Sequence, residues 1–201
     1  MSPPAAKKAK TASKHVTAPP PDNKLVRPLL TDMYQLTMCY AYWLSGRHEL
    51  PSHFELFFRK APFAGEITVA AGLDQVLSFV EHFSFDEADL SYIHKLMPNA
   101  DAKFFDYLRS LDCSAVRIEA VPQGTLVFPR MPIVTVSGPL GVCQLLETTL
   151  LTLVNYPSLV TTNAARFKLA AGPDKVLLEF GLRRAQVRGG GRRMLVADHD
   201  F

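Results

Sequence analysis

The sequence DKVLLEFGLRRAQ, residues 174–186, is the stretch from which the fold is best judged. Its apolar run, residues 176–178, follows a Gly-Pro break, a pattern typical of a buried parallel strand. The strand would end at Phe180 and be followed by two adjacent arginines, Arg183 and Arg184. An aromatic ring can stack on a flat ligand, and an arginine can bind a carboxylate or phosphate through two hydrogen bonds. The stretch therefore predicts an anionic-ligand site at a strand end, the alternative being a strand end with solvated arginines.

Length and charge set the first bounds on function. The 201 residues suffice for one domain, or for one small domain and part of another, and 48% hydrophobic and 20% charged residues are typical of globular proteins. Residues 1–16 hold four lysines and no acid, and residues 183–201 hold five arginines and two aspartates. Between these ends, acids outnumber bases by 17 to 13. The basic ends, including RGGGRR without interleaved aromatics, are weak evidence for a nucleic-acid partner.

The patterns of cysteine, histidine and hydropathy argue against a disulfide-stabilised, a zinc-binding and a membrane-spanning protein. Cys39, Cys113 and Cys143 are odd in number, widely spaced and outside any C-x-x-C motif, which favours reduced thiols in a cytosol. No histidine pair has metal-binding spacing on a helix, so no zinc site is expected. We find no signal peptide and no apolar span of membrane-crossing length. A cytoplasmic location without a membrane partner is expected.

Periodicity and turn residues predict the elements. Helices are expected over 31–45, 72–83, 86–97, 102–111 and 139–171, strands over 53–60 and 67–70, and a small antiparallel β module over 115–137. Asp32 or Thr31 would cap the first helix and place Tyr34 in its first turn, beside N–H groups that can attract an anion. A packing role is the alternative for Tyr34. Pro157 is expected to kink or split the last helix, and the small polar residues 161–166 indicate that another element packs closely there.

Three stretches together resemble one family. LLTDMYQLTM (29–38), FELFFRK with PFAGE (54–66), and TNAARF with GPDKVLLEFGLRRAQ (162–186) are similar to nicotinate phosphoribosyltransferases. The resemblance covers about residues 25–186. It implies transfer of a 5-phosphoribosyl group from phosphoribosyl pyrophosphate to nicotinate, giving nicotinate mononucleotide, an NAD precursor, with ATP hydrolysis and with Mg²⁺ at the leaving group. It also implies homodimers whose sites form across the interface.

The resemblance extends to individual residues. Tyr34 resembles the tyrosine that the neighbouring subunit lends to cover the pyridine ring, and Asp32 resembles the acid of the same string. Phe180 resembles the ring-stacking residue, and Arg183 the arginine near the anionic groups of the ligand. Arg184 is a further candidate for the phosphates. No residue is assigned to a metal.

The chain departs from the family after residue 186. Val187-Arg188-Gly189 replaces a G-P-D-G-type loop, and His199 does not stand in the context of the family's phosphorylated histidine. We expect a truncated form with little activity by itself, or alternatively a non-catalytic fragment that docks on full-length subunits. Arg166 could contact phosphates, although a structural pairing is the preferred interpretation.

The expected fold class is α+β followed by α/β, in which a β-rich N-terminal domain with helices precedes the start of an incomplete, TIM-like barrel. The predicted segments are a disordered basic tail (1–24), the N-terminal α+β domain (25–138), the long helix and first barrel strand (139–186), and a tail unlike the family (187–201).

Overall fold

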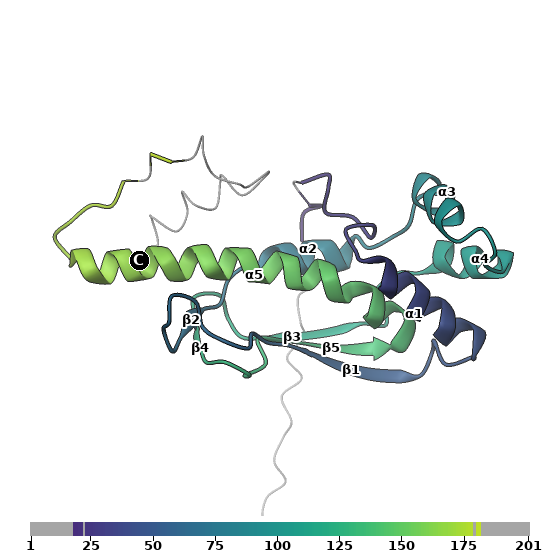
Figure 1. Cartoon of the computed structure of the whole chain (residues 1–201), viewed down its shortest axis with the longest axis horizontal. Helices are drawn as coiled ribbons and strands as arrows, with labels where there is room; N and C mark the ends of the chain where they lie inside the picture. Colours follow the sequence, from purple (N-terminus) through teal and green to yellow (C-terminus); the bar gives the residue numbers. More distant parts are fainter. Residues whose placement is uncertain (1–17, 22, 179, 182–201) are drawn as a thin grey trace, which may run out of the picture.

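The computed structural model describes residues 18–21, 23–178, 180 and 181 (Figure 1). In chain order the elements are α1 (Met33–Leu44), β1 (Pro51–Leu56), β2 (Thr68–Val69), α2 (Leu73–Glu81), α3 (Glu87–Leu96), α4 (Ala102–Ser110), β3 (Arg117–Ala120), β4 (Leu126–Val127), β5 (Val134–Pro139) and α5 (Leu140–Ala171). The five predicted helices are all present, with ends within two residues of those expected. The disordered tail and the tail unlike the family fall mostly outside the described residues, and those predictions stay untested there.

The strands form two small antiparallel sheets. In the first, β5 lies between β1 and β3, and Val136 faces Phe54 on one side and Ile118 on the other. In the second, β2 pairs with β4. The prediction of a small antiparallel β module over 115–137 is confirmed for β3 and β5, which pair antiparallel, but the module is not separate from the preceding strands. Its strands take partners from residues 51–69, because short strands pair with whichever neighbours complete a sheet over a common core.

Helix α5 is the longest element in the described part of the chain, and it packs against both sheets. It runs across the three-stranded sheet, and its second half continues over β2 and β4 (Figure 1). Its buried face includes Leu145, Leu146, Leu150 and Leu153, which join one hydrophobic core with residues of α1, α2, α4 and β5. At 1.5 Å per residue the 32-residue helix is about 48 Å long. Burial of this apolar stripe stabilises the packing of the two sheets and of the other helices against α5.

Pro157 does not split α5, which is one continuous helix from Leu140 to Ala171. Beyond the proline, the Val69 N–H of β2 donates a 2.9 Å hydrogen bond to Thr162 Oγ1. The Ala71 N–H likewise donates to Ser158 Oγ at 3.0 Å. The prediction that another element packs closely on the small polar half of this helix is confirmed, since the backbone around β2 does so.

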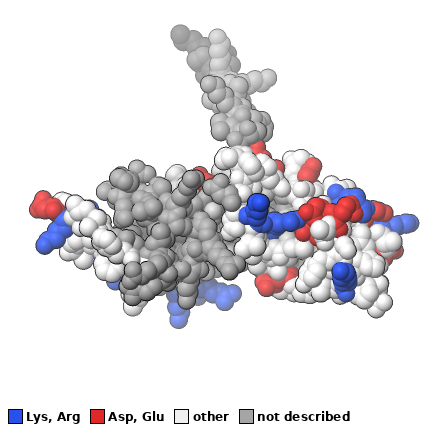
Figure 2. Space-filling view, turned by 90° about the horizontal axis from the view of Figure 1, so that it is seen from above, with Lys and Arg blue, Asp and Glu red and all other residues white. Residues whose placement is uncertain are grey.

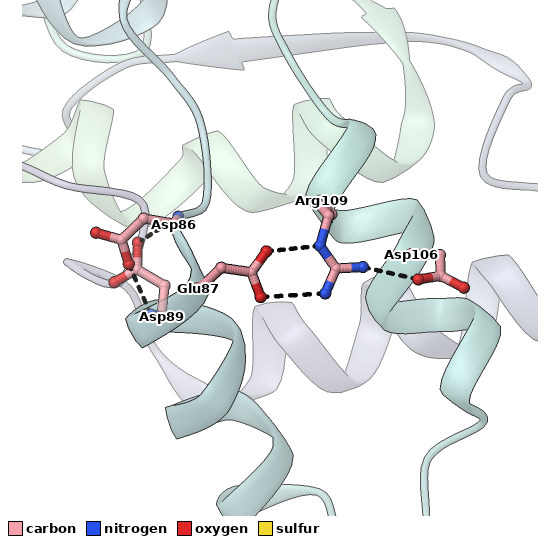
Figure 3. Close-up of polar contacts among 5 residues, drawn as sticks. All are labelled: Asp86, Glu87, Asp89, Asp106 and Arg109. Carbon is pink, nitrogen blue, oxygen red and sulfur yellow. Dashed lines mark hydrogen bonds and ion pairs between the residues drawn. The ribbon is translucent and has the colours of Figure 1, made fainter.

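Helices α3 and α4 are tied to each other by charge. Arg109 of α4 donates to both carboxylate oxygens of Glu87 on α3, at 2.7 and 3.2 Å, and to Asp106 on its own helix at 2.7 Å (Figure 3). In Figure 3, Asp86 and Asp89 lie together at the start of α3, where Asp86 accepts the Asp89 N–H at 2.8 Å. Figure 2 shows acidic and basic side chains interspersed at this end of the molecule. These charges neutralise one another, which indicates a solvated structural surface.

The described residues beyond α5 contain no strand. Residues 172–178 lack regular structure apart from a turn, and Val176 and Leu178 are 82% and 71% exposed. The prediction of a buried parallel strand over 176–180 is wrong for this structure. A buried parallel strand needs neighbouring strands and covering helices, and the two sheets that the model describes are antiparallel and lie elsewhere.

Candidate functional site

The candidate site lies where the start of α1 meets α5. Asp32 precedes α1 in an extended conformation, and its backbone N–H donates to Gln35 Oε1 at 3.2 Å, as in a capping box. Thr148 of α5 lies opposite, with its hydroxyl 2.9 Å from Asp32 Oδ2 and 2.7 Å from Gln35 Oε1. A polar cluster thus joins two helices at a point where both also carry buried apolar residues.

Tyr34 occupies the outer side of this cluster. Its hydroxyl donates to Glu147 Oε1 at 2.9 Å and accepts from Gln35 Nε2 at 3.2 Å. The residue is nevertheless 45% exposed, so its ring remains accessible. Burial of the hydroxyl, and then the hydrogen bond to Glu147, raise the pKa of Tyr34 above its ordinary value. The phenol therefore stays protonated at neutral pH and can act as a donor and as a flat apolar surface.

The electrostatics of the cluster argue against an anion at the first turn of α1. Asp32 and Glu147 bring two carboxylates to it, and among the residues that the structure describes neither forms an ion pair with a lysine or arginine. A negatively charged group placed there would meet like charges. These like charges weigh against the prediction that the helix N-terminus attracts an anion, and the N–H groups of Asp32 and Gln35 already donate to Gln35 Oε1 and to the Asp32 carbonyl.

The remaining predicted site residues are not brought to this cluster. Phe180 is described and is 82% exposed, whereas Arg183 and Arg184 lie outside the described residues. Along α5, Glu147 and Ala171 are separated by about 36 Å. The nine residues from 172 to 180 can span at most about 30 Å. Within one chain, even a fully extended return of these residues along the helix falls short of the level of Glu147.

Comparison with known proteins identifies the family and supports the fold. Residues 29–155 match the model of the nicotinate phosphoribosyltransferase (NAPRTase) N-terminal domain, a range that contains α1 and the part of α5 that faces it. The chain belongs to the nicotinate phosphoribosyltransferase family. The suspected resemblance of the sequence is thereby confirmed, and Asp32, Tyr34 and Glu147 all lie within the matched range.

Individual relatives agree with this assignment. The nicotinate phosphoribosyltransferase of Caenorhabditis elegans is 56% identical over 170 residues, which are 84% of this chain and 30% of that protein. The human enzyme is 54% identical over 166 residues, 82% of this chain and 31% of the relative. The crystal structure of human nicotinic acid phosphoribosyltransferase superposes with a TM-score of 0.74 at 53% identity, covering 81% of this chain and 32% of that one. The chain thus spans about 30% of the length of these relatives.

A more distant structure shares the fold alone. Nicotinate-nucleotide pyrophosphorylase from Pyrococcus furiosus superposes with a TM-score of 0.60 over 97% of this chain, at 18% identity. Together with the human structure it supports the expected mixed α and β fold class.

Arg166 has a structural partner in this family member. Its guanidinium lies over the ring of Phe63, 5.5 Å from the ring centre, an arrangement that contributes a cation–π attraction. The contact fixes the turn at residues 62–65 against the second half of α5. The preferred sequence interpretation, a structural pairing for Arg166, agrees with this contact.

Sequence reasoning missed a hollow that the described residues form beside α5. A cavity of about 550 Å³ lies between the end of β1 and the middle of α5, and Arg59 and Lys60 stand at its wall. Thr68 also lines it, with a buried hydroxyl that has no hydrogen-bond partner. Among the predicted site residues that the structure describes, none lines this cavity. The available signal is the Arg59-Lys60 pair at the end of the expected strand over 53–60.

Metal-binding groups, membrane-spanning helices and disulfides are absent from the described part of the chain. Within the described part of the chain, no group of three or more His, Cys, Asp or Glu side chains is placed to hold a metal ion. No helix in the same part is both long and apolar enough to cross a bilayer. The three cysteines, all in the described part, are free thiols.

Proposed function

We propose that this chain supplies the N-terminal part of a nicotinate phosphoribosyltransferase that acts in NAD biosynthesis, in the cytoplasm and as a homodimer. Its substrates would be nicotinate and phosphoribosyl pyrophosphate. The observation that carries the proposal is the family match over residues 29–155. Within this range Tyr34 is half-exposed, and its hydroxyl is hydrogen-bonded to Glu147.

The chemistry of the cluster fits one part of that ligand pair. The ring of Tyr34 can cover the flat face of a pyridine, which keeps the ring nitrogen aimed in one direction. The nearby carboxylates of Asp32 and Glu147 disfavour the nicotinate carboxylate and the phosphates on this side. Those anionic groups would instead lie with Arg183 and Arg184, and Phe180 would cover the opposite face of the ring.

The length of α5 favours a site shared by two chains. Because the residues after α5, even fully extended, span less than the helix from Glu147 to Ala171, the tyrosine of one subunit and the phenylalanine of the other are the more economical pair. In the reaction, the bond from ribose C1 to pyrophosphate breaks, positive charge develops on the ribose, and the pyridine nitrogen forms the new bond. Correct placement of the pyridine is the contribution that Tyr34 would make.

ATP and Mg²⁺ are co-reactants that the family resemblance implies. The described residues offer no set of carboxylates suited to Mg²⁺, so we assign none of them to the ion. The ion, when bound, would neutralise the departing pyrophosphate. Asp32 stays a candidate substrate-binding residue beside Tyr34 at the start of α1, where its Oδ2 lies 2.9 Å from the Thr148 hydroxyl.

The test compares two proteins. Purified 201-residue chain, supplied with nicotinate, phosphoribosyl pyrophosphate, ATP and Mg²⁺, is expected to form little nicotinate mononucleotide. A chimera in which residues 29–171 replace the matching segment of the human enzyme is expected to form it at a rate comparable to that enzyme. A chimera that folds and dimerises but forms no product would overturn the proposed function, and rapid turnover by the chain alone would overturn the expectation of low activity.

A second candidate function is that of a non-catalytic fragment that docks on full-length subunits. The second half of α5 favours it, since Phe167 and Leu169 are 61% and 81% exposed on a helix whose first half contributes to the core. Size-exclusion chromatography of the chain mixed with full-length human enzyme distinguishes the two candidates. Co-elution supports docking, and separate elution at micromolar concentration removes it.

A further inference from the structure

The hydroxyl of Tyr34 is hydrogen-bonded, whereas its ring is accessible to a ligand. The hydroxyl hydrogen is directed at Glu147 on α5, and one lone pair accepts from Gln35 on α1. A phenol has one hydrogen and a limited number of acceptor sites, so these two bonds occupy most of its hydrogen-bonding capacity. With the residue 45% exposed, the surface left for a ligand is the ring.

Both partners of that hydroxyl are themselves fixed. Gln35 is fully buried, and its amide oxygen lies near the hydroxyls of Thr31 and Thr148 and the N–H of Asp32. The Asp32 N–H, which can only donate, settles the orientation of the amide oxygen, so that Nε2 faces the phenol. A buried amide satisfied in this way has little freedom to turn.

The second carboxylate oxygen of Glu147 is hydrogen-bonded as well. Gln144, one turn earlier on α5 and buried, donates to Glu147 Oε2 at 2.9 Å, while Oε1 accepts from Tyr34. One hydrogen bond, from Tyr34, therefore links this carboxylate to the first turn of α1, and the other, from Gln144, holds it in place on α5. Hydrogen bonds to a charged acceptor are stronger than neutral ones, which makes this link stiff.

We propose that Glu147 and Gln35 are positioning residues that fix the rotamer of Tyr34, so that the tyrosine contributes its ring face rather than its hydroxyl to ligand binding. This inference deepens the proposed function and rests on it for the identity of the ligand, a flat aromatic acid. The orientation of the ring is a property of the chain without ligand. It can therefore be measured independently.

The experiment determines the χ1 rotamer of Tyr34 in the purified 201-residue chain. Three-bond couplings from the ring Cγ to the backbone N and C′ report rotamer populations, and the Tyr34→Phe variant identifies the resonance. In the unsubstituted chain we expect one rotamer. In Glu147→Ala the minor rotamers should rise by up to about tenfold, the ratio that the loss of one hydrogen bond can produce.

Conservative and distant variants separate positioning from general stability. Glu147→Gln keeps an acceptor of the same shape and is expected to restore the single rotamer. Glu66→Gln, at an exposed acid elsewhere, and Tyr92→Phe, at a 53% exposed tyrosine, should leave the Tyr34 couplings unchanged. A single rotamer in Glu147→Ala, with an amide spectrum like that of the unsubstituted chain, would overturn the inference. So would equal loss of order in Glu147→Gln and Glu147→Ala.

The two proposals fail in different ways. A chimera without nicotinate turnover contradicts the proposed function and leaves the rotamer result intact. A mobile Tyr34 ring in the unsubstituted chain contradicts the positioning role, whatever the chimera does. In an active chimera, Glu147→Ala should raise the KM for nicotinate severalfold with a smaller change in kcat, which a loss of folded protein would not produce.

Discussion

Gly72, at the start of α2, packs directly on the backbone carbonyl of Leu153 in α5. A Cβ added at Gly72 would lie 2.1 Å from the Leu153 oxygen. That carbonyl is the one whose helical donor would be the N–H of residue 157, where the chain has a proline. The Leu153 carbonyl therefore lacks its helical hydrogen bond at the point where Gly72 lacks a side chain. Both features let α2 approach α5 closely.

The substitution Gly72→Ala is expected to destabilise the fold strongly. The residue has φ of +100°, and the added methyl would overlap backbone that cannot move aside, so we expect a loss of about 2–5 kcal/mol. Gly124→Ala is the matched control, because φ is +83° there with no atom within 4 Å of the added carbon. It should cost only about 1–2 kcal/mol of backbone strain. Urea unfolding measures both, and equal losses would contradict the packing argument.

Removing the Thr162 hydroxyl tests the contact between β2 and the second half of α5. In Thr162→Val the buried N–H of Val69 loses its acceptor, and we expect a loss of about 1–3 kcal/mol. Thr161→Val, one position earlier and without a hydrogen bond from its side chain, should change the free energy of unfolding little. A Thr162→Val variant as stable as the Thr161 control would show that the hydrogen bond contributes nothing.

The cysteines should be inert while the chain is folded. Burial raises the pKa of Cys39 to about 12, and burial together with the nearby Asp112 raises the pKa of Cys113 to about 12. Since the thiolate is the reactive form, a disulfide reagent near neutral pH should label these thiols slowly in the folded chain and rapidly in urea. Absorbance after adding the reagent follows the reaction. Rapid labelling of Cys39 in a Cys113→Ser, Cys143→Ser background would contradict its burial.

The pair between α3 and α4 predicts a pH dependence. The Arg109 guanidinium lowers the pKa of Glu87 below its ordinary value. A carboxylate with a lowered pKa stabilises the folded state above its unfolded pKa, and this contribution disappears as pH falls through the folded value. Glu87→Gln should therefore lower Tm slightly near about pH 7 and leave it unchanged near about pH 2. Thermal melts at both values, with Glu66→Gln as control, check this; an equal effect at both would contradict the pairing.

Local signals in the sequence predicted α1 well. Asp32 before the helix and Gly46 after it mark its ends, and the structure places Ser45 and Gly46 as the closing residues, with φ of +68° at the glycine. Caps depend on residues within one turn, so they can be recognised without knowledge of the fold. The same holds for α3, whose cap is Asp86.

Long-range relationships could not be predicted in this way. The pairing of β4 with β2, and the hydrogen bond from Tyr34 to Glu147 across 113 positions, depend on packing against α5. The sequence carries one usable signal, the polar Gln144, Glu147 and Thr148 beside the apolar stripe in the first half of this helix. The buried strand expected after α5 was wrong because an apolar run specifies burial only where other elements surround it.

The most direct test of the account is the KM for nicotinate of the active chimera with Tyr34→Leu. If the ring of Tyr34 covers the pyridine, this variant should raise KM by about tenfold or more through the loss of an aromatic contact, and Tyr34→Phe should have an intermediate effect because its ring remains but is less firmly held. Tyr92→Leu should leave KM unchanged. A Tyr34→Leu chimera with unaltered KM and kcat would contradict the assignment of this cluster to the nicotinate site.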